Sequence, residues 1–410
     1  MNQHTPSAGF SGLGIAPIFL ETLAKLKITE PTPIQQQAIP VAIEGKDLVG
    51  IAQTGTGKTF AFGIPMIQRL HQMKKRGLVV LPTRELAIQV DESLRKIGIG
   101  LGLRTAVLIG GAPMGPQRWA ISQDPHIIVA TPGRLNDHLQ QKTVRLDNVK
   151  IVVLDEADRM LDMGFAPQIR QIFHSLPAGE RQTMLFSATM PAEIMKLATA
   201  YMKLPIRIEV APSGTTAERV TQEIFIISKD EKLRLTEKLL QKYVGTTLIF
   251  TKTKYGAKRL TTAIRTMGHT AAEIHSNRSL SQRRDALEGF KSGRYRVLIA
   301  TDIASRGIDV TGIELVINYD LPTNTEDYVH RIGRTARAGA GGHAISLVLP
   351  DQRRDLQAIE RLVKKTLPVA HLPGFSSHPT PSPVAKFPPK HHRGSARARH
   401  TRSGFRGYRR

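Results

Sequence analysis

Short runs of β-branched and other apolar residues alternate with longer amphipathic segments from about residue 46 to residue 367. The apolar runs predict buried strands, and the three- and four-residue apolar spacing between them predicts crossover helices. The expected strands are 47–51, 78–81, 127–129, 151–154, 184–186, 224–227, 248–250, 297–300, 315–317 and 344–348. The expected helices are 59–73, 84–97, 134–141, 192–202, 232–243, 255–267 and 281–290. This alternation is typical of an α/β fold built on parallel sheets.

A break in the pattern divides the chain into two lobes. Residues 211–219 are small and polar without helix or strand periodicity, so we expect a linker at 213–219. The predicted units are an N-terminal parallel-sheet domain at 1–212, the linker, a C-terminal domain at 220–367 and a basic tail at 368–410. The tail has nine lysines and arginines, no acidic residue and many prolines, so we expect it to be disordered.

Composition limits the class of partner. The 410 residues carry a net charge of +24, and such an excess implies a polyanionic partner, for which nucleic acid is a better candidate than a membrane surface. No apolar stretch approaches the length of a membrane span and the first residues lack a secretory signal, so we expect a cytoplasmic protein. The absence of cysteine excludes disulfides and thiolate metal sites. Any metal must be held by oxygen or imidazole.

A glycine-rich loop follows the first predicted strand and precedes its helix. It is close to the P-loop pattern, with alanine at the leading glycine position, and reads Ala52-Gln53-Thr54-Gly55-Thr56-Gly57-Lys58-Thr59. The glycines let backbone N–H groups turn toward phosphate, Lys58 can reach the β- and γ-phosphates, and the Thr59 hydroxyl can hold magnesium. The loop therefore predicts binding of ATP with Mg²⁺. The alternative is an ordinary glycine turn.

Three carboxylates follow the strand predicted at 151–154, in the sequence Asp155-Glu156-Ala157-Asp158. At the carboxyl edge of a parallel sheet beside a P-loop, Asp155 is expected to bind magnesium. Glu156 is expected to polarise the water that attacks the γ-phosphate. Taken alone, the tetrapeptide could equally be a capping cluster at the start of a helix. Its place beside Lys58 and Thr59 favours the catalytic interpretation.

The ordered motifs of the chain resemble those of the DEAD-box RNA helicases, a family of superfamily two, over roughly residues 10–367. In chain order the matching segments are PTPIQ at 31–35, the P-loop, PTRELA at 82–87, GG at 110–111, TPGR at 131–134, DEAD at 155–158, SAT at 187–189, LIFT at 248–251, ATDIASRGID at 300–309 and HRIGRTAR at 330–337. The resemblance implies two tandem RecA-like domains and an RNA-stimulated ATPase that locally unwinds short RNA duplexes and remodels RNA–protein complexes.

The resemblance also assigns residues to the nucleotide. Gln35 is expected to read the adenine edge, because a side-chain amide offers one kind of donor and one kind of acceptor. Phe10 is expected to stack on the base, and Asp309 to hydrogen-bond the ribose. The family usually has glycine and an aromatic residue where this chain has Lys27 and Ile28, so the packing of that loop is open. Without the flanking motif, a solvated glutamine would be the preferred interpretation.

Three arginines recur at three-residue spacing in the second lobe, and one helical face would present all three of Arg331, Arg334 and Arg337. The resemblance makes Arg334 and Arg337 arginine fingers on the γ-phosphate. Residues expected to couple the nucleotide site to lobe closure are Asp158, Ser187, Thr189, Asp302 and His330. A solvated basic helix is the alternative for the arginine series.

The resemblance further implies a path for the RNA backbone without sequence preference. The expected contacts are Pro82, Arg84, Gly111, Thr131, Gly133 and Arg134 in the first lobe and Thr251, Arg283, Arg284 and Thr301 in the second. The sequence does not say which of the two adjacent arginines points inward, and each threonine alone could be a helix cap. The basic tail is expected to add RNA affinity.

Two rival functions share most of these features. A DNA helicase or translocase of the same superfamily would have similar lobes, although Gln35 and the DEAD tetrapeptide favour RNA. An RNA-binding scaffold without catalysis is disfavoured by the intact Lys58, Glu156 and arginine residues. The run LDEADRMLDMGF at 154–165 resembles the bacterial RhlE-type branch. Relatives act in ribosome assembly, RNA decay or cold adaptation, and the residues do not choose among these roles.

Overall fold

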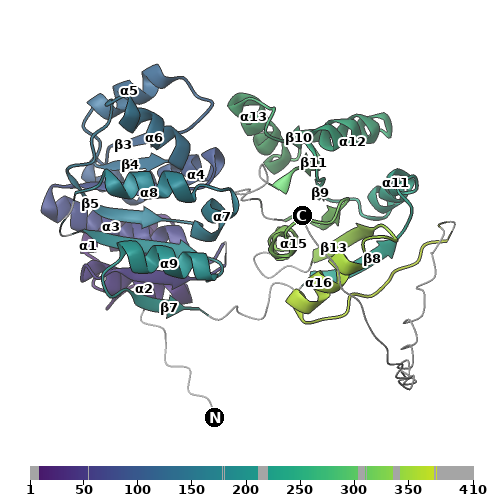
Figure 1. Ribbon diagram of the computed structural model, residues 1–410, viewed down its shortest axis with the longest axis horizontal. Coiled ribbons are helices and arrows are strands. Elements are labelled where there is room, and N and C mark those ends of the chain that lie inside the picture. Colours follow the sequence, from purple (N-terminus) through teal and green to yellow (C-terminus); the bar gives the residue numbers. More distant parts are fainter. Residues whose placement is uncertain are drawn as a thin grey trace, which may run out of the picture.

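Two parallel-sheet lobes lie side by side in the computed structural model (Figure 1), which describes residues 9–53, 55–177, 179, 181–210, 220–302, 310, 312–335, 342–373 and 375. Among these residues, the first lobe has a seven-stranded sheet in the order β3-β4-β2-β5-β6-β1-β7. The second lobe has a six-stranded sheet in the order β10-β11-β9-β12-β13-β8. The α/β fold with two tandem RecA-like lobes is confirmed.

The first sheet is parallel at every junction, with register pairs such as Leu48 with Met184 and Ile151 with Gln182. Its strands are β1 (Leu48–Ile51), β2 (Arg76–Val80), β3 (Thr105–Leu108), β4 (Ile127–Ala130), β5 (Val149–Leu154), β6 (Gln182–Ser187) and β7 (Ile206–Glu209). Its helices are α1 (Pro17–Lys25), α2 (Pro33–Ile43), α3 (Lys58–Met73), α4 (Arg84–Ile97), α5 (Met114–Ser122), α6 (Pro132–Gln140), α7 (Ala157–Asp162), α8 (Ala166–His174) and α9 (Ala192–Tyr201).

The second sheet repeats this arrangement. Its strands are β8 (Val220–Ile226), β9 (Thr247–Phe250), β10 (Ala271–Ile274), β11 (Val297–Ala300), β12 (Leu315–Asn318) and β13 (Gly342–Val348). Its helices are α11 (Lys232–Lys242), α12 (Lys254–Thr266), α13 (Leu280–Lys291), α15 (Thr325–Ile332) and α16 (Arg353–Val363). Within the described part of the chain, no helix has both the length and the apolar character of a membrane span.

Each sheet separates two hydrophobic layers, because successive strand residues point to opposite faces. In β5, Ile151 and Val153 pack in one cluster, whereas Val152 and Leu154 pack in the other. In the second lobe, Leu248 of β9 faces one layer and Ile249 faces the other. Helices on both faces cover these layers, which explains why the strands read as continuous apolar runs.

All ten predicted strands and all seven predicted helices are present, with ends shifted by at most four residues. Strands β3, β7 and β10 and several helices were not predicted. Strand β10 has the sequence AAEI, and alanine and glutamate are weak strand formers. Its pairing with β11 and its buried position supply the stability that local propensity does not.

The second lobe extends beyond its predicted end at residue 367. The N–H of Ile224 donates to Pro368 O at 3.0 Å, and the N–H of Ala370 donates to Ile224 O at 2.8 Å. Leu372 and Phe375 pack against the apolar layer of the lobe. The prediction that disorder begins at Pro368 is therefore wrong for residues 368–373, of which 368–370 pair with Ile224 at the edge of β8. The predicted linker at 213–219 and residues 376–410 lie outside the described residues.

Candidate active site at the facing edges of the two sheets

The carboxyl edge of the first sheet is divided between two sets of predicted functional residues. The P-loop follows β1, the DEAD segment follows β5 and the SAT segment follows β6, and these three strands are neighbours in the order β5-β6-β1. The segments assigned to RNA follow β3, β4 and β2, which form the other half of the sheet. Parallel strands bring their carboxyl ends to one edge, so the two halves form one continuous surface.

The P-loop has the backbone shape that phosphate binding needs. Gly55 and Gly57 both have φ of 88°, a left-handed conformation that favours glycine. Lys58 begins α3, and its buried Nζ donates to Ala52 O at 3.1 Å. The Thr56 hydroxyl donates to the backbone oxygen of Gln53 at 2.7 Å, and Thr59 is half-buried in the first turn of the helix. Thr54 lies outside the described residues.

Lys58 and Asp155 lie together at the buried end of this loop. The Lys58 Nζ is 4.0 Å from Asp155 Oδ1, and both side chains are 5% exposed. Burial raises the pKa of Asp155 to about 6, which the attraction of Lys58 offsets only in part. The neighbouring carboxylates of Glu156 and Asp158 also raise this pKa. A carboxylate in this environment favours a cationic partner, because such a partner replaces the lost hydration.

Glu156 has φ of 52° and is 6% exposed. A left-handed conformation costs a non-glycine residue about 1–3 kcal/mol, and such strain is often found at functional sites. The strained residue is the N-cap of α7, so it turns the chain sharply between β5 and the helix. Glu156 makes no side-chain cap hydrogen bond to α7, whereas Asp158 Oδ1 accepts the N–H of Arg159 at 2.9 Å, so the capping alternative applies to Asp158 and not to Glu156.

Gln35 connects the segment upstream of the first strand to the P-loop. Its Oε1 accepts the N–H of Thr32 at 3.0 Å, and its Nε2 donates to Gly57 O at 3.0 Å. One amide hydrogen and one oxygen lone pair remain, which is the pair of groups that an adenine edge requires. Phe10 is 5% exposed and packs in the apolar layer of the first lobe, while Ile28 packs against the same layer. The stacking of Phe10 on adenine stays a prediction.

The loop at Lys27 departs from the family in sequence but keeps a glycine-like backbone. Lys27 has φ of 57°, within the left-handed region where the family usually has glycine. The N–H of Ile28 donates to Leu23 O at 2.9 Å and closes the end of α1. The substitution of lysine for glycine is therefore accommodated with strain and without a change of fold.

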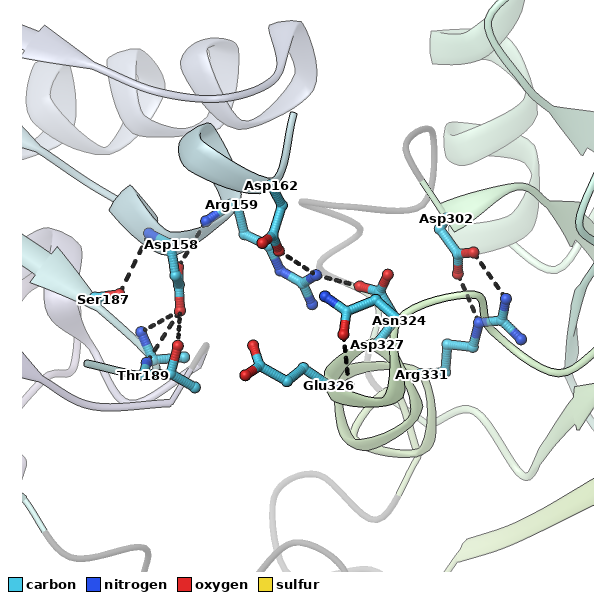
Figure 2. Close-up of polar contacts among 11 residues, drawn as sticks. Asp158, Arg159, Asp162, Ser187, Thr189, Asp302, Asn324, Glu326, Asp327 and Arg331 are labelled. Atoms are coloured by element: carbon cyan, nitrogen blue, oxygen red, sulfur yellow. Dashed lines mark hydrogen bonds and ion pairs between the residues drawn. The ribbon is translucent and has the colours of Figure 1, made fainter. Parts of the chain in front are cut away.

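Asp158 ties the DEAD segment to the SAT segment. Its Oδ2 accepts hydrogen bonds from the N–H of Ala188 at 3.0 Å, from the N–H of Thr189 at 3.0 Å and from the Thr189 hydroxyl at 3.1 Å. Its own N–H donates to Ser187 Oγ at 3.3 Å. Figure 2 shows this group on the first-lobe side of the gap between the lobes. The structure thus joins these two segments directly, and their expected role in coupling stays a prediction.

Arg331 and Arg334 do not share one helical face. Helix α15 ends at Ile332, so Arg334 lies in the turn that follows it. The guanidinium of Arg331 is buried inside the lobe, where it donates to Asp302 at 2.6 and 2.8 Å and to Asn318 Oδ1 at 3.1 Å. The prediction of a shared face is wrong, because the helix is shorter than the arginine series.

The remaining residues of that motif divide into described and undescribed positions. Arg334 is 6% exposed and His330 is half-buried on α15. The expected role of His330 in coupling the nucleotide site to lobe closure stays a prediction. Arg337 and Asp309 lie outside the described residues. Asp302, expected to take part in coupling, is the bidentate partner of Arg331 (Figure 2) and so fixes α15 to the end of β11.

The RNA-assigned residues of the first lobe lie along the carboxyl ends of β2, β3 and β4. The guanidinium of Arg84 lies directly against Gly111 and occupies the space that a side chain at this position would need. Arg134 Nη1 donates to Ala112 O at 2.8 Å. Thr131 precedes α6, and its side chain makes no cap hydrogen bond there, which weakens the helix-cap alternative. Pro82 is buried and Gly133 half-buried beside this track.

The second lobe resolves the choice between its adjacent arginines. Arg283 is buried and its Nη2 lies 2.8 Å from Glu85 Oε2 of the first lobe. Arg284 is exposed and pairs with Glu288 on its own helix at 2.8 Å. Arg283 therefore points toward the gap between the lobes. Thr251 and Thr301 follow the neighbouring strands β9 and β11, and Thr251 Oγ1 donates to Thr253 O at 3.3 Å.

A second ion pair across the lobes was not predicted. Arg159 of α7 donates to Asp327 Oδ1 of α15, and its Nη1 lies 3.7 Å from Asp162 Oδ2 on its own helix (Figure 2). The side chains of Arg159 and Asp327 are 5% and 10% exposed. They are separated by 168 positions in sequence, so no local pattern links them.

Comparison with known proteins identifies the class of this site. A family model described as DEAD/DEAH box helicase matches residues 32–197, and one described as helicase conserved C-terminal domain matches residues 231–339. The chain is 43% identical over 363 residues to the ATP-dependent rRNA helicase RRP3 of Debaryomyces hansenii, covering 88% of this chain and 76% of that protein. The chain belongs to the DEAD/DEAH box helicase family. The RRP3 of Meyerozyma guilliermondii is 44% identical over 83% of this helicase.

Solved structures support the same conclusion for the arrangement of the lobes. S. cerevisiae Dbp5 bound to RNA and ADP BeF3 matches with a TM-score of 0.80 and 29% identity, over 88% of this helicase and 95% of that chain. Mss116 bound to ssRNA and UDP-BeF matches with a TM-score of 0.81 and 26% identity, over 88% and 79%. These similarities span both lobes of the helicase.

Proposed function

We propose that this ATP-dependent RNA helicase closes its lobes on single-stranded RNA when ATP binds, and that closure locally unwinds short RNA duplexes and remodels RNA–protein complexes. The observation that carries the proposal is the divided carboxyl edge of the first sheet. Its β5-β6-β1 half holds the P-loop and carboxylates, and its β3-β4-β2 half holds the RNA-assigned residues. One closure of the second lobe can therefore act on both halves.

The first lobe supplies the groups that bind the nucleotide. Lys58 contacts the β- and γ-phosphates, the turned backbone at 55–57 surrounds them, and Gln35 with Phe10 selects adenine. Asp309 contacts the ribose. Glu156 accepts a proton from the water that attacks the γ-phosphorus, and ADP leaves as the P–O bond to the β-phosphate breaks.

The residues fit a magnesium ion bound together with the nucleotide. Among the described residues, no cluster of three or more acidic or histidine side chains could hold a metal on its own. Magnesium characteristically takes one or two protein ligands, substrate phosphates and several waters. The proposed ligands are the Thr59 hydroxyl and Asp155, whose pKa burial raises to about 6 despite the nearby Lys58. When bound, the ion neutralises phosphate charge that develops during transfer.

The second lobe completes the site on closure. Arg334, held one turn beyond Arg331, and Arg337 stabilise charge on the γ-phosphate, because a planar guanidinium matches the phosphate oxygens. His330, Asp302 and the Asp158–Ser187–Thr189 group couple this event to lobe closure. Release of phosphate removes the attraction, and the lobes separate.

The RNA track favours backbone recognition. Arginine, threonine and backbone groups contact phosphates and 2′-hydroxyls, so binding has no sequence preference. Arg283 is the member of its pair proposed to contact RNA, and Arg284 is not. The rRNA helicase name of the relatives supports structured ribosomal RNA as the substrate class and ribosome assembly as the role.

Subgroup, location and boundaries are narrower proposals. The run at 154–165 supports an RhlE-like subgroup, but the relatives compared above carry the RRP3 name instead. A cytoplasmic location is proposed, and an rRNA substrate would place the helicase wherever ribosomal RNA is processed. We propose domains at 1–212 and 220–367, a linker at 213–219 and a basic RNA-binding tail whose start lies after the packed segment at 368–373.

Phosphate release from ATP by the full-length protein tests the proposal. We expect single-stranded RNA to stimulate the rate and DNA of the same sequence to stimulate it little, as the 2′-hydroxyl contacts require. Glu156→Gln should lower turnover at least ~100-fold, since it removes the base, while ATP and RNA still bind together. Glu193→Gln, an exposed residue on α9, is the matched control. Equal rates with and without RNA would overturn the proposal. A preference for DNA would overturn it in favour of a DNA translocase.

A further inference from the structure

Arg159 lies among four acidic side chains contributed by both lobes and forms ion pairs with two of them. Asp158 and Asp162 lie on α7, and Glu326 and Asp327 lie in the first turn of α15. Figure 2 shows the Arg159 guanidinium joined to Asp162 and Asp327, while the Asp158 carboxylate points to Thr189. We refer to Asp158, Asp162, Glu326 and Asp327 as the acidic quartet. The guanidinium donates directly to Asp327 and lies 3.7 Å from Asp162. Neither Arg159 nor Asp327 is assigned to ATP, to magnesium or to RNA above.

We propose that Arg159 and Asp327 are positioning residues that set the register of α15 on the DEAD segment when the lobes close, and so deliver Arg334 to the nucleotide. This inference rests on the proposed function, because it concerns RNA-driven closure. The pair acts through other residues and does not contact substrate.

Both ends of the pair are attached to rigid parts of the active site. On the first lobe, Asp158 precedes Arg159 and is fixed by four hydrogen bonds to residues 187–189 at the end of β6, as described above. On the second lobe, Asp327 lies four residues before Arg331, which is locked to Asp302 and Asn318. A displacement at Asp327 must therefore move α15, and with it the turn that carries Arg334, as a unit.

The N-terminus of α15 is shaped to hold an acidic partner for Arg159. Asn324 Oδ1 accepts the N–H of Glu326 at 3.3 Å and caps the helix. Glu326 and Asp327 both lie in the first turn, where a helix stabilises negative charge. Burial, followed by repulsion from Asp162 and Asp158, raises the pKa of Glu326. The carboxylates of the two lobes thus repel one another unless Arg159 lies between them.

The energetics of this ion pair favour a role in aligning the two lobes over a role in increasing the affinity between them. Burying an ion pair costs desolvation that its attraction roughly offsets, so an intact pair adds little net affinity. Removing one member, by contrast, leaves an unpaired charge among like charges. When the lobes are open, water solvates the same charged side chains, so leaving them unpaired costs little free energy. Loss of Arg159 is therefore expected to weaken closure selectively, and not the folding of either lobe.

Charge reversal and charge exchange test this inference in the full-length protein. We expect Arg159→Glu and Asp327→Arg each to lower the RNA-stimulated turnover number at least ~10-fold. A factor of this size corresponds to the coupling energy of a close charge pair at an interface. The exchange variant carrying both Arg159→Asp and Asp327→Arg should recover much of this loss. Recovery should be partial, since arginine at a helix N-terminus opposes the helix dipole. Arg159→Lys should give an intermediate loss, because lysine keeps the charge without the planar fork.

Fluorescence energy transfer gives a readout that a purely structural role would not change. The chain has no cysteine, so Met195→Cys and Val244→Cys, at exposed positions in different lobes, can carry the dyes. The closed fraction with an ATP analogue and RNA should fall in Arg159→Glu and return in the exchange variant. The thermal unfolding profile and ATP binding by the first lobe should stay unchanged.

The exposed pair Arg207–Glu209 on β7, with side chains 56% and 57% exposed, provides a matched control for charge exchange. Arg207→Glu combined with Glu209→Arg should leave turnover unchanged. The inference is overturned if Arg159→Glu closes and turns over like the parent protein, or if the exchange variant shows no recovery while remaining folded. A parent protein whose ATPase ignores RNA would refute the proposed function instead.

Discussion

The Lys58 ammonium lies 4.0 Å from the Asp155 carboxylate in a region where both side chains are 5% exposed, yet Asp155 has a pKa raised to about 6. Desolvation therefore outweighs the nearby positive charge. The arrangement is costly without nucleotide and becomes favourable only when a further cation arrives, as expected for a residue that binds magnesium together with ATP.

We predict that Asp155→Asn stabilises the nucleotide-free first lobe while abolishing turnover. The raised pKa means that the folded state binds a proton more tightly than the unfolded state, so stability falls as pH rises from about 4 to about 6. A shift from 3.8 to about 6 corresponds to roughly 3 kcal/mol above pH 6. The gain from Asn should reach 1 to 3 kcal/mol at pH 7.5 and roughly half as much at pH 5.

Urea denaturation at the two pH values measures this gain. Asp137→Asn, at a position whose side chain is 56% exposed, is the control and should show little change. A variant at Asp155 that is less stable than the parent at pH 7.5 would show that Lys58 dominates the site and that desolvation does not.

Gln35→Ala is predicted to weaken ATP binding and also to destabilise the first turn of α2. The change removes the hydrogen bond to Gly57 O and the acceptor for the Thr32 N–H. One lost hydrogen bond to the P-loop corresponds to about 1 kcal/mol, or roughly fivefold in ATP affinity, and any contact with adenine adds to it. Gln36→Ala, on the exposed face of the same helix, is the control. Titration with ATP and with GTP should show that only Gln35→Ala reduces the preference for adenine.

Arg283→Ala and Arg284→Ala are predicted to differ sharply although the residues are adjacent. Arg283 is buried and paired with Glu85 across the lobes, whereas Arg284 is 64% exposed and pairs with Glu288 on its own helix. Losing Arg283 leaves the Glu85 carboxylate without its partner, so closure on RNA should weaken by about 2 kcal/mol or more. Surface pairs such as Arg284–Glu288 contribute roughly 0.3–0.5 kcal/mol. RNA affinity measured with an ATP analogue distinguishes the two, and equal effects would contradict the assignment.

Local sequence signals predicted the helices and strands whose apolar residues recur at a regular spacing. Helix α4 has apolar residues at helical spacing, an N-cap at Thr83 and basic residues in its last turn, and its predicted limits of 84–97 agree with the structure. Strand β3 was missed because its sequence, TAVL, lacks the continuous run of large apolar residues that marks predicted strands of the same length such as β4, IIVA. Its position at the sheet edge depends on pairing with β4, which is a tertiary relationship.

The residues of the site likewise divide into those predicted from local sequence and those that depend on tertiary contacts. Lys58, Asp155 and Asp158 occur in short contiguous motifs directly after predicted parallel strands, so their grouping at the carboxyl edge of one sheet could be predicted. Arg159 and Asp327 could not be paired from sequence, because their contact depends on how two separately folded lobes meet. The three-residue spacing of the arginines misled the prediction for Arg331, since spacing indicates a shared face only where the helix continues.

Two truncations should separate the packed start of the tail from its basic remainder. Ending the chain after Leu367 removes the backbone bonds of Pro368 and Ala370 to Ile224 and the contact of Phe375 with Arg234, whose Cζ lies 4.6 Å from the ring centroid. We expect the second lobe to lose about 1 to 3 kcal/mol of stability. Ending it after Phe375 keeps these contacts and removes nine positive charges, so stability should hold while RNA affinity falls.

Salt dependence provides the quantitative measurement for the tail. Each cation that contacts single-stranded RNA adds about 0.7 to the slope of log affinity against log salt, so the truncation after Phe375 should flatten that slope. ATPase activity at saturating RNA should persist, because the closing groups lie in the two lobes. An unchanged slope would mean that the tail does not contact RNA. Equal thermal stability of the two truncations would mean that the segment at 368–373 does not stabilise the second lobe.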